Sequence, residues 1–167
     1  MAKTYEPIET TTLGSAAASY TFTSISGAYT DLRLVIQATV STATGGYASL
    51  QYNSDTGTNY SYVVVQGNGT SALSTYGSNV NRLYLNNNGA AFNSTTNPVQ
   101  WTVDIMNYSN ATTNKTTLTR FSSSYYSTDT IVGLWRSTAA ISTIKVENPN
   151  ASFAIGSTFS LYGILSA

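Results

Sequence analysis

The segment YTDLRLVIQATV (residues 29–40) carries the clearest structural pattern in the chain. Its apolar residues recur at every second position, which predicts a β-strand, because successive side chains of a strand point to opposite faces. Arg33, Gln37 and Thr39 occupy the other face, where Val35 is the only apolar residue. The apolar face therefore has to be covered by another part of the fold; its residues are Leu32, Leu34, Ile36, Ala38 and Val40.

The C-terminal segment TFSLYGIL (residues 158–165) is the best candidate to cover this strand or to pair beside it. Its apolar side chains fall on both faces, a pattern typical of a strand that is buried on both sides. We therefore expect the first long strand and the last strand to lie close together in one core.

Short segments of strand pattern follow one another along the rest of the chain, separated by turn residues at a spacing typical of sandwich folds. Residues 62–65, with three consecutive valines, suit a sheet interior. Residues 53–59, 67–78 and 86–98 are small and polar and are expected to be loops. The sequence thus predicts an all-β antiparallel two-sheet β-sandwich of about nine or ten strands, most simply of the jelly-roll type. The segments expected to be strands are 19–25, 29–40, 47–52, 60–66, 82–85, 99–105, 117–122, 131–136, 141–147 and 158–165.

The length of 167 residues suits one domain, and no change in composition divides the chain. Residues 1–13 contain Pro7 and three consecutive threonines, and we expect an extended N-terminal arm or edge strand there. Residues 14–167 are expected to form a single β-sandwich domain.

Composition excludes several classes of function. The chain has no cysteine and no histidine, so disulfides, thiolate metal sites and imidazole-based proton transfer are absent. Seven basic and seven acidic residues cancel and are scattered singly, which argues against nucleic acid binding. No apolar run has the length of a membrane span, and the first residues do not resemble a signal peptide. We expect no enzyme, no cofactor, no metal site and no membrane partner.

Carboxylates and one turn were considered as chemical sites. Asp104 with Asp129 or Glu147 is the only candidate pair for glycoside hydrolysis, but each fits a solvated or paired position better. Residues 55–59 carry oxygen ligands at alternate positions, yet they lack the further acidic residues of a calcium loop, and a plain turn is the better interpretation.

Tyrosines are the most suggestive feature for binding. Tyrosine combines apolar area with a hydrogen-bonding hydroxyl, and with asparagine and serine it is typical of surfaces that bind sugars or proteins. The alternative is that these tyrosines cap the ends of the sandwich core, and both interpretations stay open. Trp101 and Trp135 are expected in the core. The candidate contacts for a partner or glycan are Tyr5, Tyr47, Tyr60, Tyr76, Tyr108, Tyr125 and Tyr126.

Several segments resemble a group of small virion proteins encoded by tailed bacteriophages: TYEPI (4–8), TTTL (10–13), YTF (20–22), YTDL (29–32), MNYS (106–109) and FSLYGI (159–164). This resemblance implies a structural protein on the exterior of the particle, assembled in the host cytoplasm, with a jelly-roll-like fold and usually an oligomeric state. It carries no active-site residues to transfer to this chain.

Two functions follow as hypotheses. The first is a capsid decoration or cement protein that binds the major capsid protein or another virion protein and stabilises the head shell, as a homo-oligomer and most simply a trimer. The second is a head-fibre or tail-fibre module that binds host-surface glycans through its loops. A charge-poor surface rich in hydroxyl and amide groups suits both.

Overall fold

Antiparallel β-strands make up nearly all of the regular structure. The computed structural model describes residues 5–87 and 89–165. It contains one short 3₁₀ turn, η1 (Gly89–Ala91), and the strands β1 (Tyr5–Thr12), β2 (Ser19–Phe22), β3 (Asp31–Ala38), β4 (Ser49–Tyr52), β5 (Tyr60–Gly67), β6 (Ala72–Val80), β7 (Leu83–Tyr84), β8 (Val99–Met106), β9 (Lys115–Ser122), β10 (Thr128–Trp135), β11 (Ile144–Glu147) and β12 (Thr158–Ile164).

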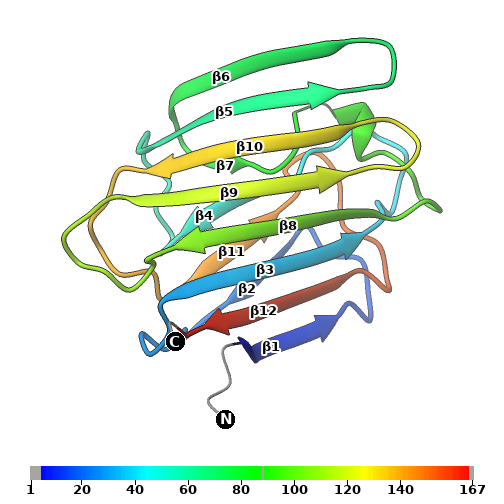
Figure 1. Cartoon of the computed structure of the whole chain (residues 1–167). Helices are drawn as coiled ribbons and strands as arrows, with labels where there is room; N and C mark the ends of the chain where they lie inside the picture. The colour runs from blue at the N-terminus through cyan, green and yellow to red at the C-terminus, as the bar shows by residue number, and fades with distance from the viewer. Residues whose placement is uncertain (1–4, 88, 166–167) are drawn as a thin grey trace.

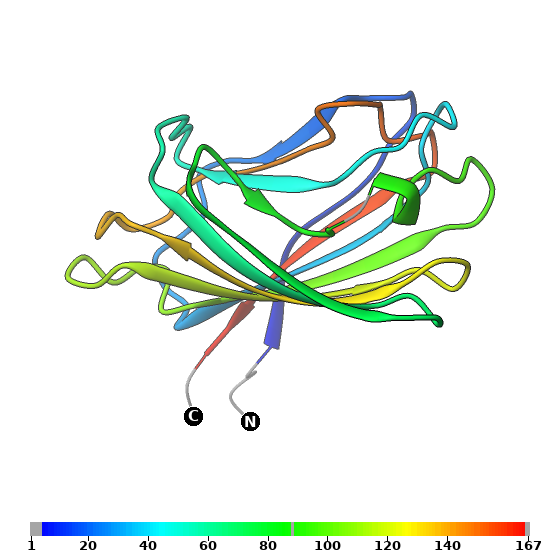
Figure 2. The same ribbon diagram turned by 90° about the horizontal axis from the view of Figure 1, so that it is seen from above.

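Two sheets of unequal width pack face to face, which confirms the predicted all-β two-sheet fold (Figures 1 and 2). The large sheet has eight strands in the order β1-β12-β3-β8-β9-β10-β5-β6. The small sheet has four, in the order β2-β11-β4-β7. No helix within residues 5–87 and 89–165 is long and apolar enough to span a membrane.

The path of the chain explains the unequal widths. If the hairpins β5–β6 and β9–β10 are set aside, four strands remain in each sheet, and successive strands lie in opposite sheets except for β4 and β7, which are neighbours in the small sheet. The jelly-roll type stays a prediction; relative to this pattern of strands, the two hairpins are insertions. Both hairpins add to the same sheet, so the large sheet is twice as wide as the small one.

The predicted central strand is β3, and its apolar face is buried as expected. Leu32, Leu34 and Ile36 are fully buried, and β12 pairs with β3 along its length. On β12 the inner residues Phe159 and Leu161 are buried, whereas the outer residues are only partly covered. The expectation that β12 is buried on both faces is therefore wrong for its outer face.

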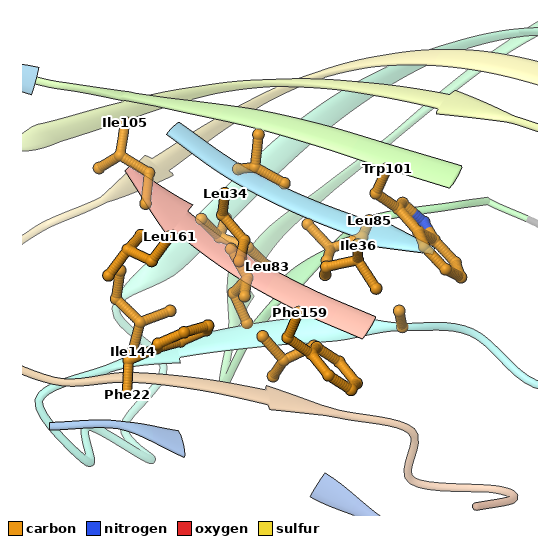
Figure 3. Close-up of a cluster of buried hydrophobic side chains, with 14 of the residues drawn as sticks. Phe22, Leu34, Ile36, Leu83, Leu85, Trp101, Ile105, Ile144, Phe159 and Leu161 are labelled. Atoms are coloured by element: carbon orange, nitrogen blue, oxygen red, sulfur yellow. The ribbon is translucent and has the colours of Figure 1, made fainter. Parts of the chain in front are cut away.

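The core lies between the sheets, where side chains of β3, β8 and β12 meet those of β2, β11 and β7 in the small sheet (Figure 3). Trp101 packs edge-on against Phe92, with ring centroids 4.8 Å apart, and both predicted core tryptophans are buried. The labelled residues are Phe22, Leu34, Ile36, Leu83, Leu85, Trp101, Ile105, Ile144, Phe159 and Leu161.

One predicted irregular segment differs from the structure, and the N-terminal segment takes the edge-strand form that the sequence left open. Residues 5–12 of the expected arm form β1, an edge strand paired with β12, and residues 1–4 lie outside the described residues. The prediction of a loop over residues 67–78 was wrong, because most of this segment belongs to the strand β6. Among the described residues of 86–98, which were expected to form a loop, η1 is the only helix or strand.

Candidate interaction surface

The outer face of the large sheet carries a cluster of exposed apolar side chains on the inserted hairpins. Tyr76, Val63, Val132 and Leu118 stand directly opposite one another on β6, β5, β10 and β9. Val65 lies two residues along β5 from Val63, on the same face. We call these five residues, Val63, Val65, Tyr76, Leu118 and Val132, the apolar patch.

Solvent reaches all members of the apolar patch. Tyr76 is 75% exposed, and Val63, Val65 and Val132 are each more than half exposed. The patch thus exposes a few hundred Å², the range in which an apolar surface on a monomer is often functional. A shallow hollow of about 240 Å³ lies within it and is lined by Val63, Tyr76 and Val132.

The other half of the outer face is ionic and aromatic. Asp104 on β8 accepts a hydrogen bond from Arg33 Nε at 2.5 Å and lies 3.5 Å from Arg120. The hydrogen bond to Asp104 raises the pKa of Arg33. The Arg33 guanidinium also lies over the ring of Tyr5, which stacks on Tyr162 with centroids 4.8 Å apart. These charges are satisfied within the sheet, so this half offers no free charge cluster.

The β5–β6 hairpin, in contrast, has no charged residue between Tyr60 and Val80. On its inner side, Tyr62 packs against Tyr84 of β7 with ring centroids 5.0 Å apart. Gly77 allows this contact, because a Cβ at that position would lie 2.6 Å from the Tyr62 ring. The small sheet ends at β7, so β6 forms an open edge beyond it (Figure 1).

The predicted tyrosine contacts divide by exposure. Tyr76 and Tyr5 are exposed on the outer face, near opposite edges of the large sheet. Tyr60 and Tyr108 are fully buried, which removes them from any surface in this structure. The Tyr60 hydroxyl donates to Asp55 O at 3.1 Å, and the Tyr108 hydroxyl donates to Ser26 O. Both rings therefore lie in the core and their hydroxyls bind loop backbone, which agrees with the alternative interpretation that these tyrosines cap the ends of the core.

Tyr47, Tyr125 and Tyr126 are partly buried. The Tyr125 hydroxyl accepts hydrogen bonds from the backbone N–H groups of Asn93 and Ser94, both at 3.2 Å, and donates to Ala91 O at 3.0 Å. It connects the β9–β10 loop to the segment after η1. Tyr47 packs edge-on against Tyr84.

A polar hollow of about 590 Å³ lies at one end of the large sheet, between the β5–β6 turn and the β9–β10 loop. Amide, hydroxyl and phenol groups line it, including Asn68, Gln100 and Tyr126, and no charged residue does. Its chemistry suits a neutral, hydroxyl-rich ligand such as a sugar.

The three candidate carboxylates do not form a catalytic pair. Asp104 lies on the outer face of the large sheet, whereas Asp129 is buried on the inner side, where it accepts hydrogen bonds from Gln66 Nε2 at 2.9 Å and Asn87 N at 2.8 Å. Glu147 belongs to the small sheet and is paired with Arg82 and Lys145. Each carboxylate is held by its own partners.

The turn at Asp55 is a structural turn. Its carboxylate accepts hydrogen bonds from Gly57 N at 2.8 Å, Asn59 Nδ2 at 2.9 Å and Trp135 Nε1 at 2.7 Å. Hydrogen-bond donors thus occupy the oxygens that a calcium ion would need. Across the part of the chain that the structure describes, no group of three or more acidic side chains could hold a metal ion.

Sequence reasoning missed most of the apolar patch. The valines of β5 were assigned to a sheet interior, but only Val64 is buried, while Val63 and Val65 face solvent. Two features of the sequence could have indicated an exposed apolar face. β5 carries apolar residues on both of its faces, and on β10 the apolar Val132 lies on the face opposite to that of Ile131 and Trp135. The distribution of apolar residues along these strands does not indicate which of the two faces the small sheet covers.

Comparison with known proteins adds no assignment: no protein-family model matches the chain, and no curated protein is significantly similar to it in sequence.

Proposed function

We propose that the chain is a structural protein of a bacteriophage virion, and that it decorates the outside of the head shell. The observation that carries this proposal is the apolar patch, a solvent-facing group of large side chains on strands that add to one sheet only. An apolar patch of this size on a monomeric protein is often a binding surface. The resemblance of several segments of the chain to virion proteins is the reason for proposing the phage particle as the binding partner.

Docking through the apolar patch needs no charge on the partner. The uncharged β5–β6 hairpin can approach a protein shell without an unpaired charge becoming buried. Each copy would bury a modest area, and many copies on one particle make a weak single contact sufficient. Stabilisation of the shell then follows from bridging between neighbouring capsid subunits.

The test uses purified particles of the virus that encodes the chain. Particles made without the protein should lose resistance to heat, and added wild-type protein should restore it. The double variant Val63→Thr, Val132→Thr keeps the β-branched shape but places two hydroxyls in the contact. Since each valine is about half exposed, we expect the variant to lose about 2 kcal/mol of binding, or about 30-fold in affinity.

The matched control is Ile155→Thr, which removes an aliphatic side chain that is 69% exposed but lies outside the apolar patch. It should restore heat resistance as wild type does. Absence of the protein from the particles, or equal restoration by the double valine variant, would overturn the proposal.

The polar hollow supports a second candidate, a fibre-type module that binds host glycans. Its neutral lining of amides, hydroxyls and Tyr126 is the supporting observation. A glycan array separates the two candidates: binding that is lost in Tyr126→Ala and kept in Val63→Thr, Val132→Thr would favour the glycan module.

A further inference from the structure

The two edges of the large sheet are built differently. At the β1 edge, Pro7 lacks a backbone N–H, the register with β12 shifts between Pro7 and Glu9, and Glu6 and Glu9 add negative charge. Proline, bulges and charges are the features that keep an edge strand from pairing with another chain. The β1 edge is therefore protected.

The β6 edge has none of these features over most of its length. Residues 72–80 contain no charge and no proline. The strand runs in continuous register with β5 from Ala72 to Ser78, and the only shift lies beyond Ser78, at Asn79, whose φ is 55°. The β6 edge thus presents seven residues in unbroken register, with no neighbouring strand on that side among the described residues.

We propose that β6 pairs antiparallel with β6 of a second copy of this chain. A two-fold axis makes such a contact self-complementary, because the same strand supplies both sides. The register that uses the whole regular segment 72–78 places Thr75 opposite Thr75 of the second copy. Ser74 then lies opposite Tyr76 of the second copy, and the two large sheets become continuous.

Three features favour a second copy over a strand of another protein. The hairpin from Tyr60 to Val80 is uncharged, so two hairpins meet without like-charge repulsion. The two strands have the same length and the same regular segment, so each outward backbone group of residues 72–78 finds a partner in the second copy. Pairing also brings the two apolar patches together into one surface, because Tyr76 lies beside the contact on the same outer face.

The absence of cysteine from the chain makes a direct test possible, because any disulfide must come from an introduced thiol. Directly opposite residues of an antiparallel pair have Cα atoms about 4.5–5.5 Å apart, which suits a disulfide. Under mild oxidation, Thr75→Cys should give a covalent dimer. Tyr76→Cys should give much less, because its copies are offset, and Thr12→Cys on the protected β1 edge should give none.

Sedimentation of the isolated protein gives an independent measurement. We expect a concentration-dependent monomer–dimer equilibrium. Ser74→Lys should weaken the dimer at least about tenfold, because each lysine would lie opposite Tyr76 of the second copy and about 7–8 Å from the other lysine. Circular dichroism and thermal unfolding of monomeric Ser74→Lys should match wild type. A monomer at all concentrations, a trimer, or cross-linking at Thr12 instead of Thr75 would overturn the inference.

This inference goes beyond the proposed function and can fail separately from it. Dimerisation is measured on the isolated protein, whereas shell binding is measured on particles. A dimer that does not bind particles would refute the decoration role and leave the β6 contact intact.

Discussion

The hydrogen bond between Trp135 and Asp55 gives the sharpest quantitative prediction. Trp135 Nε1 donates to Asp55 Oδ2 at 2.7 Å and ties the turn after β4 to the end of β10. A hydrogen bond to a charged group contributes about 1.5–3 kcal/mol, and the partial exposure of Asp55 places this one near the lower end. In a double-mutant cycle of Trp135→Phe and Asp55→Ala, we therefore predict a coupling free energy of about 1.5 kcal/mol.

The pH dependence of this coupling follows from the pKa of Asp55. Burial alone would raise that pKa, but hydrogen bonds from Trp135, Asn59 and Gly57 outweigh burial and hold it below its ordinary value of 3.8. A carboxyl group with a lowered pKa in the folded state stabilises the protein above its unfolded pKa. The stabilisation is lost as the pH falls below 3.8 through the folded-state pKa. The coupling should thus be full near neutral pH and shrink in acid.

Denaturant unfolding followed by circular dichroism measures the coupling free energy at neutral pH and in acid. Trp101→Phe is the matched control, because Trp101 is fully buried and its Nε1 has no hydrogen-bond partner among the residues that the structure describes. Its cost should come from packing alone and stay constant with pH. A coupling near zero at neutral pH, or one of equal size in acid, would refute the reasoning.

Two further stability predictions rest on single side chains. Gly163→Ala should lower the free energy of unfolding by about 1–3 kcal/mol, because the added Cβ would lie 2.3 Å from the ring of Tyr29; Gly67→Ala, with nothing within 4 Å, is the control in thermal unfolding. Burial raises the pKa of Tyr60 from 10.0 to about 12, so stability should fall as the pH rises between these values, since the unfolded chain ionises first. Tyr60→Phe should cost about 1–2 kcal/mol at neutral pH and make this alkaline decline shallower; an unchanged slope in denaturant midpoints would contradict the assignment.

The sequence predicted the central strands well because their burial is one-sided or nearly so. β3 alternates between buried and partly exposed positions, and its apolar period of two directly reports which face meets the small sheet. Trp101 and Trp135 were placed in the core because their apolar neighbours along each strand share their phase. Periodicity is informative where one face of a strand is buried and the other is wet.

The same reasoning failed where both faces of a strand meet solvent and where a side chain beside a loop is buried. β6 lies beyond the small sheet, so most of its residues are exposed and no alternation marks it as a strand. Backbone pairing with β5, and not side-chain burial, defines this strand. The tyrosines show the same limit: Tyr60 and Tyr108 stand beside loops in the sequence, but their rings are buried and only their hydroxyls reach the loop backbone.

The inserted hairpins connect the architecture to the proposed interactions. The other eight strands form two sheets of four strands each, and their inner faces supply most of the core; these strands are β1, β2, β3, β4, β7, β8, β11 and β12. The hairpins β5–β6 and β9–β10 add buried residues such as Tyr60 and Phe121, but they also add the whole apolar patch and the open β6 edge. A sandwich that had only to fold would have no need to widen one sheet and leave valines facing water. The exposed surface of these hairpins is therefore where a partner of this protein is to be sought, on the outer face for a shell and along β6 for a second copy.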